Sequence, residues 1–329
     1  MPTITPVLPA TTRLYENEHD LAAIVELMRV CEVVDHLQDT TTLAELRDEY
    51  AQPWFNPRTN VRLWFDAGDQ LVAAAELWPP QGALAEANEP RLFMWYKVHP
   101  DFRGGLLEQR MLAWASQHVA MLVRQHQMPI KLGISLTHVE AELEPMLLDA
   151  GFTQERAFFR MERSLATIAA PRFPEGFTCR AGELSAEGYV ALHNDVWVDH
   201  FGYEPWTVDV VNHYRSEATY DAGLDMIAYA PDGTPAGFCW SSMRHQESPE
   251  QARYGHIGLL GVRREYRKRR LGQALLREAM QRLRERGASM ASLGVDAASP
   301  TGATRLYAAE GFATAFTRTT YMRRFYPNE

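Results

Sequence analysis

Long apolar runs are missing from this sequence of 329 residues, and no stretch approaches the ~20 apolar residues that a membrane-spanning helix needs. Cysteine is scarce: only Cys31, Cys179 and Cys239 occur, an odd number without the spacing of a metal site or a disulfide framework. The first residues lack the basic and apolar segments of a secretory signal. We therefore expect a cytoplasmic protein with no membrane partner and no metal.

The charge balance also excludes a class of partner. The formal net charge is -9, whereas binding to a nucleic-acid backbone normally needs a broad basic face. One segment is strongly basic despite the negative net charge, because six of the eight residues 263–270 are Lys or Arg. That segment lacks the Gly-Lys-Ser/Thr of a Walker loop and the Gly-x-Gly-x-x-Gly of a dinucleotide site. Such a basic segment is more often a solvated surface or a nucleic-acid-binding patch. The net negative charge of the whole chain instead favours a small polyphosphate ligand here.

The neighbours of the basic segment support an anion site. Residues 256–262 are short, apolar and interrupted by glycine, as in a buried strand. After the segment, apolar residues recur along one face of an expected helix, at Leu271, Leu275, Ala279 and Leu283. A helix N-terminus offers unpaired N–H groups and a partial positive charge. Strand, basic turn and helix start together predict a phosphate-binding loop.

The two halves of the sequence share landmarks in the same order, which predicts a tandem duplication. Arg103 and Arg267 each precede a long amphipathic helix, and Gly151 and Gly311 each precede phenylalanine and a final strand. Residues 169–176 have the composition of a linker. We therefore expect two domains, 1–168 and 175–329.

Each half mixes hairpins with crossover connections, and strands outnumber helices. This order predicts an α/β fold in which each domain has a mixed, mostly antiparallel sheet flanked by helices.

Two motifs carry a resemblance to a known family. Arg269-x-x-Gly272-x-Ala274 resembles the acyl-CoA loop of the GNAT superfamily of N-acetyltransferases, and Leu306-Tyr307 with Gly311-Phe312 resembles its second signature. The resemblance implies a GNAT-like fold in each half and acetyl-CoA as the acyl donor. It assigns coenzyme A binding to Leu260, Gly261, Val262, Arg267, Lys268, Arg269, Arg270, Leu271, Gly272, Gln273, Ala274 and Ser299. Lys268 and Arg270 depart from the glycines common in the family, and Ser299 stands where an asparagine is common.

The resemblance also assigns catalytic roles in the second half. Tyr307 is the expected acid for the leaving thiolate, although a buried tyrosine otherwise packs a helix on a sheet. The N–H of Leu260 or Gly261 would meet the developing oxyanion at a bulge. His256 stands where a glutamate is common and is the expected base, with an ordinary surface histidine as the alternative. Cys239 would be inert packing, so we expect direct transfer.

The first half resembles a degenerate copy. Leu147 replaces the motif tyrosine, and Glu108 lies near the place of Ala274, where a carboxylate would repel a pyrophosphate. We expect this half to be catalytically inactive, while Gly104 and Gly105 leave its binding of coenzyme A open.

Residues 195–206 crowd aromatics and carboxylates together, and Asp199, His200, Tyr203 and Trp206 are the expected contacts of an amine substrate. A loop held by its own aromatics is the alternative. The tandem layout, the degenerate first half and the segment from Val295 to Ala303 together resemble the mycothiol synthase family, which acetylates an amine on a cysteinyl sugar. We expect a small-molecule amine as acceptor and a monomer or homodimer. A protein or peptide acetyltransferase and a non-catalytic acyl-CoA-binding module are the alternatives.

Overall fold

The computed structural model describes residues 11–81, 89–182, 184–200, 203–244, 253–299 and 301–327. They form two compact units. One unit contains the chain up to Arg156 together with the chain from Arg318 on, and the other is Ala157–Thr317. No helix in these ranges is long and apolar enough to cross a membrane.

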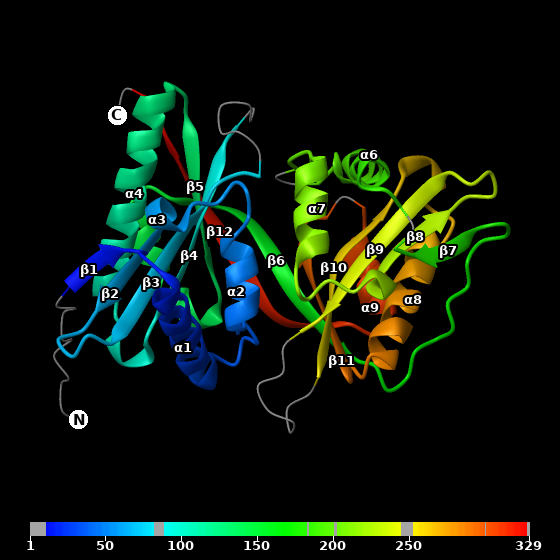
Figure 1. The fold of residues 1–329 in the computed structure, drawn as a ribbon, viewed down its shortest axis with the longest axis horizontal. Coiled ribbons are helices and arrows are strands. Elements are labelled where there is room, and N and C mark those ends of the chain that lie inside the picture. The colour runs from blue at the N-terminus through cyan, green and yellow to red at the C-terminus, as the bar shows by residue number, and fades with distance from the viewer. Residues whose placement is uncertain are drawn as a thin grey trace. The chain divides into compact units, whose positions relative to one another are not determined.

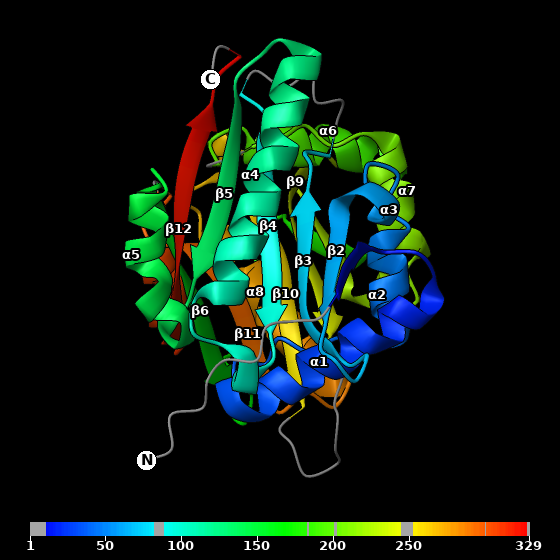
Figure 2. The same cartoon turned by 90° about the vertical axis from the view of Figure 1, so that its left-hand side faces the viewer.

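Six neighbouring strands of the described chain lie in the first unit, in the order β1-β2-β3-β4-β5-β12 (Figure 2). Its pairs are antiparallel except for β4 and β5, which run parallel. The strands are β1 Thr11–Leu14, β2 Val61–Phe65, β3 Leu71–Trp78, β4 Arg91–Val98, β5 Ile130–Leu136 and β12 Ala313–Phe325. The helices are α1 Glu18–Asp35, α2 Leu43–Tyr50, α3 Pro57–Asn60, α4 Leu106–His126 and α5 Glu144–Asp149.

The second unit repeats this topology with the order β7-β8-β9-β10-β11-β6 (Figure 1). Again all pairs are antiparallel except one, the parallel pair of β10 and β11. The strands are β6 Thr153–Ser164, β7 Thr178–Ala181, β8 Asp225–Tyr229, β9 Pro235–Met243, β10 Tyr254–Val262 and β11 Met290–Asp296. The helices are α6 Ala186–Trp197, α7 Val208–Ser216, α8 Leu271–Glu285 and α9 Ala303–Ala309. The predicted duplication of a mixed, mostly antiparallel sheet is confirmed.

The last strand of each sequence half lies in the sheet of the other unit. β6 pairs with β11 from Met290↔Ser164 to Asp296↔Phe158, and β12 pairs with β5 from Thr319↔Leu136 onward. The compact units therefore divide the chain differently from the sequence halves. We propose that the halves 1–168 and 175–329 are the two copies of the duplicated segment.

Two apolar clusters in the second unit lie on opposite faces of its sheet. Alternate residues of β8 face opposite ways, so Met226 packs with α8 and α9 while Ile227 packs with α6 and α7. The predicted apolar stripe of α8 is buried, as Leu271, Leu275, Ala279 and Leu283 are each at most 1% exposed. The helix is thereby fixed against the sheet with its first turn beside the end of β10.

Candidate active site

A cavity of about 810 Å³ opens in the second unit. It runs between the end of α6, the last residues of β10, the basic loop, the first turn of α8 and helix α9. Its lining residues are Val196, Trp197, Asp199, His200, Leu260, Gly261, Val262, Tyr266, Arg267, Lys268, Arg270, Leu271, Gly272, Gln273, Thr301, Gly302, Ala303, Leu306 and Tyr307.

Strand β10 presents an open edge to this cavity. Its parallel pairing with β11 spans only Tyr254↔Met290 to Ile257↔Leu293, and a bulge follows at Gly258. The N–H of Arg263 donates to the carbonyl of Ala236 on the β9 side at 3.0 Å. Because N–H groups alternate between the two edges of a strand, those of Leu260 and Val262 point away from β9. They are available where the pairing with β11 has ended.

Gly261 is required for the close approach of α6 to β10. A side-chain carbon at this position would overlap Val196 and lie 3.0 Å from Trp197. The missing side chain therefore lets the end of α6 form one wall of the cavity.

The basic loop takes the backbone conformation that glycine favours. Lys268 and Arg270 have φ angles of 63° and 65°, in the left-handed region, and both line the cavity. Arg270 is the N-cap of α8, and its side chain makes no capping hydrogen bond to this helix start. The first N–H groups of α8 and two cationic side chains thus face the same cavity, which is an arrangement suited to an anion.

Other arginines of the loop are structural. Arg267 donates to the carbonyl of Val262 at 3.0 Å and to Asp199 at 3.1 Å, and Arg264 also pairs with Asp199. Arg263 pairs with Asp195 at 3.2 Å. Hydrogen bonds from Arg264 and Arg267 lower the pKa of Asp199 to about 2. Asp199, predicted to contact an amine, lines the cavity but is engaged by two arginines.

Tyr307 lies on α9 with 7% of its surface exposed and lines the cavity. Its ring packs edge-on against Phe312 with centroids 6.0 Å apart. Burial, with a smaller effect of Cys239, raises the pKa of Tyr307 well above its ordinary value of 10.0. The phenol therefore stays protonated and can donate a hydrogen bond at any pH near neutrality.

His256 lies on β10, where its Nδ1 is 3.3 Å from Ser292 Oγ. Burial, and then the charges of Arg160 and Arg244, lower the pKa of His256 to about 3. The imidazole is neutral at pH 7 and accepts a proton only weakly. It is not among the residues that line the 810 Å³ cavity.

Cys239 is fully buried on β9, and its Sγ lies 3.8 Å from Ser241 Oγ. Burial raises the pKa of Cys239 to about 12. A thiol of this kind forms almost no thiolate near neutral pH and is a poor nucleophile.

A second cavity of about 270 Å³ meets β10 on its bulged side, at Gly258 and Leu259. Four aromatic side chains line it, and three of them stand edge-on to the fourth, Trp240. The edge-on three are Trp206, Tyr214 and Tyr220, at interplanar angles of 84° to 90°.

A column of stacked rings leads from this second cavity to the first. His193 lies between Trp206 and Trp197, with ring centroids 4.0 Å and 5.3 Å away, and Trp197 stacks on His200 at 4.3 Å. Trp206 lines the smaller cavity, whereas Trp197 and His200 line the larger one. The predicted substrate residue Tyr203 is among the lining residues of neither cavity.

Most of the residues predicted to bind coenzyme A line the 810 Å³ cavity. Arg269, Ala274 and Ser299 are the exceptions: Arg269 donates to Glu265 O, Ala274 is buried, and Ser299 hydrogen-bonds Thr301. The sequence reasoning missed the cavity residues Val196, Trp197, Tyr266, Thr301, Gly302, Ala303 and Leu306. Of these, Leu306 stands beside Tyr307 in the second motif, and Val196 and Trp197 lie in the aromatic segment 195–206.

The corresponding place in the first unit is closed. Arg103 donates to the carbonyl of Val98 and pairs with Asp35, as Arg267 does with Val262 and Asp199. Here, however, Glu108 is buried and its carboxylate accepts the N–H of Gly105, the N-cap of α4, at 2.9 Å. The adjacent cavity is only about 20 Å³. The chain's own carboxylate thus occupies the helix start that is open in the second unit.

Comparisons with known proteins agree with this geometry. Residues 189–312 match the acetyltransferase (GNAT) family. The chain is 32% identical over 253 residues to a mycothiol acetyltransferase of Thermobispora bispora, covering 74% of this chain and 77% of that relative. Its fold is similar to a GCN5-related N-acetyltransferase from Sphaerobacter thermophilus, with a TM-score of 0.75, 23% identity and 96% of both chains covered. It is also similar to a tandem GNAT protein from the clavulanic acid biosynthesis pathway, with a TM-score of 0.70, 14% identity, and 95% of this chain and 98% of that chain covered. The chain therefore belongs to the GNAT family and is an acetyltransferase of the tandem type.

Proposed function

We propose that this acetyltransferase moves the acetyl group of acetyl-CoA to the primary amine of a small molecule, by direct transfer in a ternary complex. One observation carries the proposal. A single cavity in the second unit joins an uncapped, basic helix start to an unpaired strand edge and to a protonated phenol. These are the groups that a thioester donor needs at its phosphate end and at its reacting end.

At the phosphate end, the residues fit a pyrophosphate. The first N–H groups of α8 donate to anionic oxygens, and Lys268 and Arg270 add positive charge beside them. Gln273 also lines the cavity, and its amide is held by Glu310 at 2.6 Å. Acetyl-CoA supplies an activated acyl group on a thioester when it is bound there.

At the reacting end, Leu260 and Tyr307 take complementary roles. The N–H of Leu260 points away from β9 and stabilises negative charge on the carbonyl oxygen, in preference to that of Gly261, which points toward β9. Tyr307 donates a hydrogen bond to the departing sulfur and transfers its proton as the carbon–sulfur bond breaks. The amine nitrogen loses one proton as the carbon–nitrogen bond forms, and that proton, passed directly or through water, restores the phenol. The buried thiol of Cys239 supports direct transfer without an acyl-enzyme.

On the amine side, the aromatic cavity around Trp240 receives the acceptor. Its lining includes Gly258 at the bulge of β10 and Leu259, the residue before Leu260, so an amine held there can reach the acyl carbon. Aromatic faces also attract an ammonium group or stack on a sugar. His256 stays the candidate base, but its low pKa makes it weak, so we expect its replacement to lower turnover far less than that of Tyr307.

The name of the similar mycothiol acetyltransferase suggests the acceptor class. We propose an amine on a thiol-bearing cysteinyl sugar, bound by one chain or a homodimer. The test is thiol release from acetyl-CoA with cysteinyl sugars, amino sugars, simple amines and lysine peptides, and mass spectrometry of the N-acetylated product. Turnover of a small amine supports the proposal, whereas turnover of peptides alone overturns it. Tight binding of coenzyme A without turnover of any amine would also overturn it.

A further inference from the structure

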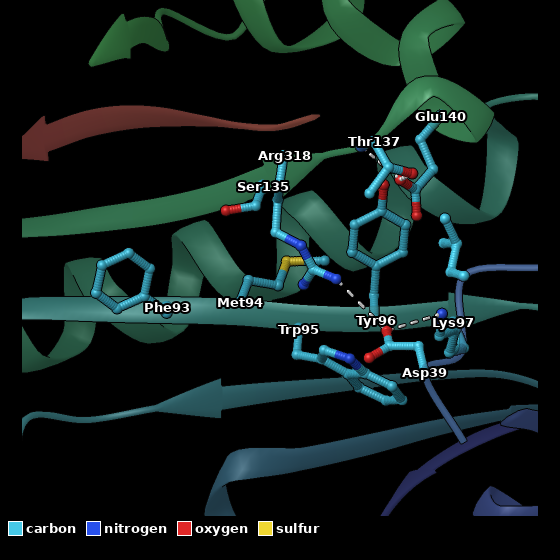
Figure 3. A pocket seen from close by; sticks show the side chains of 11 residues that line it. Asp39, Phe93, Met94, Trp95, Tyr96, Lys97, Ser135, Thr137, Glu140 and Arg318 are labelled. Carbon is cyan, nitrogen blue, oxygen red and sulfur yellow. Dashed lines mark hydrogen bonds and ion pairs between the residues drawn. The ribbon is translucent and has the colours of Figure 1, made fainter. Parts of the chain in front are cut away.

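A cavity of about 230 Å³ lies in the first unit, where β4 and β5 separate. The two strands pair only from Arg91↔Lys131 to Met94↔Ile134, and the residues beyond Met94 on β4 line the opening (Figure 3). The matching arginine anchors at Val98 and Val262 make Tyr96 the counterpart of Leu260. This cavity therefore occupies the place in the first unit that the proposed transfer point occupies in the second.

Coenzyme A does not suit this cavity. The helix start beside it is filled by the buried carboxylate of Glu108, and only about 20 Å³ remains next to Arg103. A second anion at that place would meet the charge of Glu108 in a partly desolvated site. The ligand must therefore be small and lie within the 230 Å³ space.

One end of the cavity carries two cations around a single carboxylate. Lys97 is 7% exposed, and its Nζ lies 3.4 Å from Asp39 Oδ2. Arg318 lies 3.6 Å from the same oxygen, and both cations line the cavity (Figure 3). A buried cation needs close anionic partners, and both distances here are long for charge-assisted hydrogen bonds. A further carboxylate at this end would complete the coordination of both cations.

The other end carries a fixed carboxylate. Glu140 accepts hydrogen bonds from the N–H of Thr137 at 2.8 Å and from its hydroxyl at 2.6 Å, both on the same oxygen. Figure 3 shows Glu140 and Thr137 near the hydroxyl end of Tyr96, with Asp39 near the other end of that side chain. The cavity therefore has one cationic and one anionic end, and the side chain of Tyr96 lies along the wall between them (Figure 3).

A hydroxyl without a partner among the described residues lies at the anionic end, beside Glu140 and Thr137 (Figure 3). The hydroxyl oxygen of Tyr96 is buried and has no hydrogen-bond partner in the described part of the chain. An unsatisfied buried polar group costs about 1–3 kcal/mol, so such a group needs a reason. The wall beside it is apolar, with Phe93 40% exposed and Trp95 under the ammonium of Lys97.

We propose that this cavity binds a free amino acid with an apolar or aromatic side chain. Its carboxylate pairs with Lys97 and Arg318, its ammonium group with Glu140, and its side chain lies against Phe93 and Trp95. The hydroxyl oxygen of Tyr96, at the Glu140 end, accepts a hydrogen bond from the ligand ammonium group. The site is separate from the transfer cavity of the second unit and does not rest on the proposed function.

The test measures binding of the proteinogenic amino acids to the full chain, by thermal shift and then by calorimetry. At least one apolar or aromatic amino acid is expected to bind. Its N-acetyl and methyl-ester forms, tested on the unaltered protein, are expected to bind about tenfold or more weakly, because each loses a charged partner. Equal binding of the ester or the N-acetyl form would overturn the proposal.

Variants then locate the site. Lys97→Met and Glu140→Gln are each expected to weaken binding about tenfold or more. The matched control is Lys131→Met, because Lys131 pairs with Glu89 and Glu155 away from the cavity. Absence of binding by every amino acid would overturn the proposal, and so would binding that survives both cavity variants. Acetyl-CoA turnover is measured on the same variants and is expected to be unchanged, which separates this proposal from the function of the second unit.

Discussion

Replacing Lys268 or Arg270 by glycine separates the charge of the basic loop from its fold. Both residues hold left-handed backbone conformations, which cost about 1 kcal/mol for a residue other than glycine. Both line the cavity, and no described residue forms an ion pair with either. Glycine therefore removes the charge without a backbone conflict. The relief of backbone strain in the folded state roughly offsets the conformational entropy that glycine adds to the unfolded chain.

The expected effect on binding is modest and depends on salt. Both side chains are exposed, so each contact with a phosphate contributes about 0.5–1.5 kcal/mol to binding. This free energy lies between that of a surface ion pair and that of a hydrogen bond to a charged group. Each glycine variant should then weaken acetyl-CoA binding by about two- to tenfold, and the double variant by more. The difference from the wild type should shrink as salt is raised.

Calorimetry with acetyl-CoA at low and high salt measures these changes, and thermal unfolding checks the fold. The matched control is Arg269→Ala, which removes a charge from the same loop, but from a side chain that lies over Tyr266 and donates to Glu265 O. We expect the control to bind within about twofold of the wild type. Equal weakening by the control, or unchanged affinity in both glycine variants, would refute the assignment of the loop.

Three further predictions test the surroundings of the site. Gly261→Ala should lower the free energy of unfolding by about 1–3 kcal/mol and weaken acetyl-CoA binding, because the new methyl group overlaps Val196. Urea unfolding measures the stability and calorimetry measures the binding. A variant that binds acetyl-CoA as the wild type does would contradict the role of Gly261 in the cavity wall. Cys239→Ala should keep turnover within about twofold, since the thiol is buried and protonated, and an inactive but folded variant would indicate a thiol intermediate. His193 and His256 have pKa values lowered to about 4 and about 3, so below pH ~6.5 the unfolded chain takes up protons that the folded chain does not. The free energy of unfolding should therefore fall as the pH drops from 6.5 toward 4, by up to about 1.4 kcal/mol per pH unit for each histidine, and His256→Gln should reduce that slope in urea titrations.

The local patterns of the sequence predicted much of the fold. The apolar stripe of α8, the presence of hairpins in each half and the repeated topology follow from periodicity and turn residues that lie close together in the chain; the hairpins are those of β2 with β3 and of β8 with β9. The exchange of β6 and β12 between the units could not be predicted. Both are strands with ordinary alternation, and their partners are chosen by contacts far apart in the sequence.

Part of the active site could not be predicted from the sequence either. The role of Asp199 depends on arginines more than sixty residues away, so a carboxylate in an aromatic segment suggested an amine contact instead. The low pKa of His256 arises from burial and from Arg160 on the exchanged strand β6. The sequence showed only that Lys268 and Arg270 replace glycines common in the family; their left-handed conformations explain why glycine is common at these two positions.

The most direct test of the central claim compares wild type with Tyr307→Phe for turnover of acetyl-CoA with an accepted amine, alongside the Kd for acetyl-CoA. The substitution removes one hydroxyl from the cavity wall and leaves the packing against Phe312 in place. If Tyr307 donates the proton, kcat should fall about 10²-fold or more while the Kd changes little. Turnover that stays close to the wild-type rate, with the Kd unchanged, would contradict the assignment of this cavity as the place of acetyl transfer.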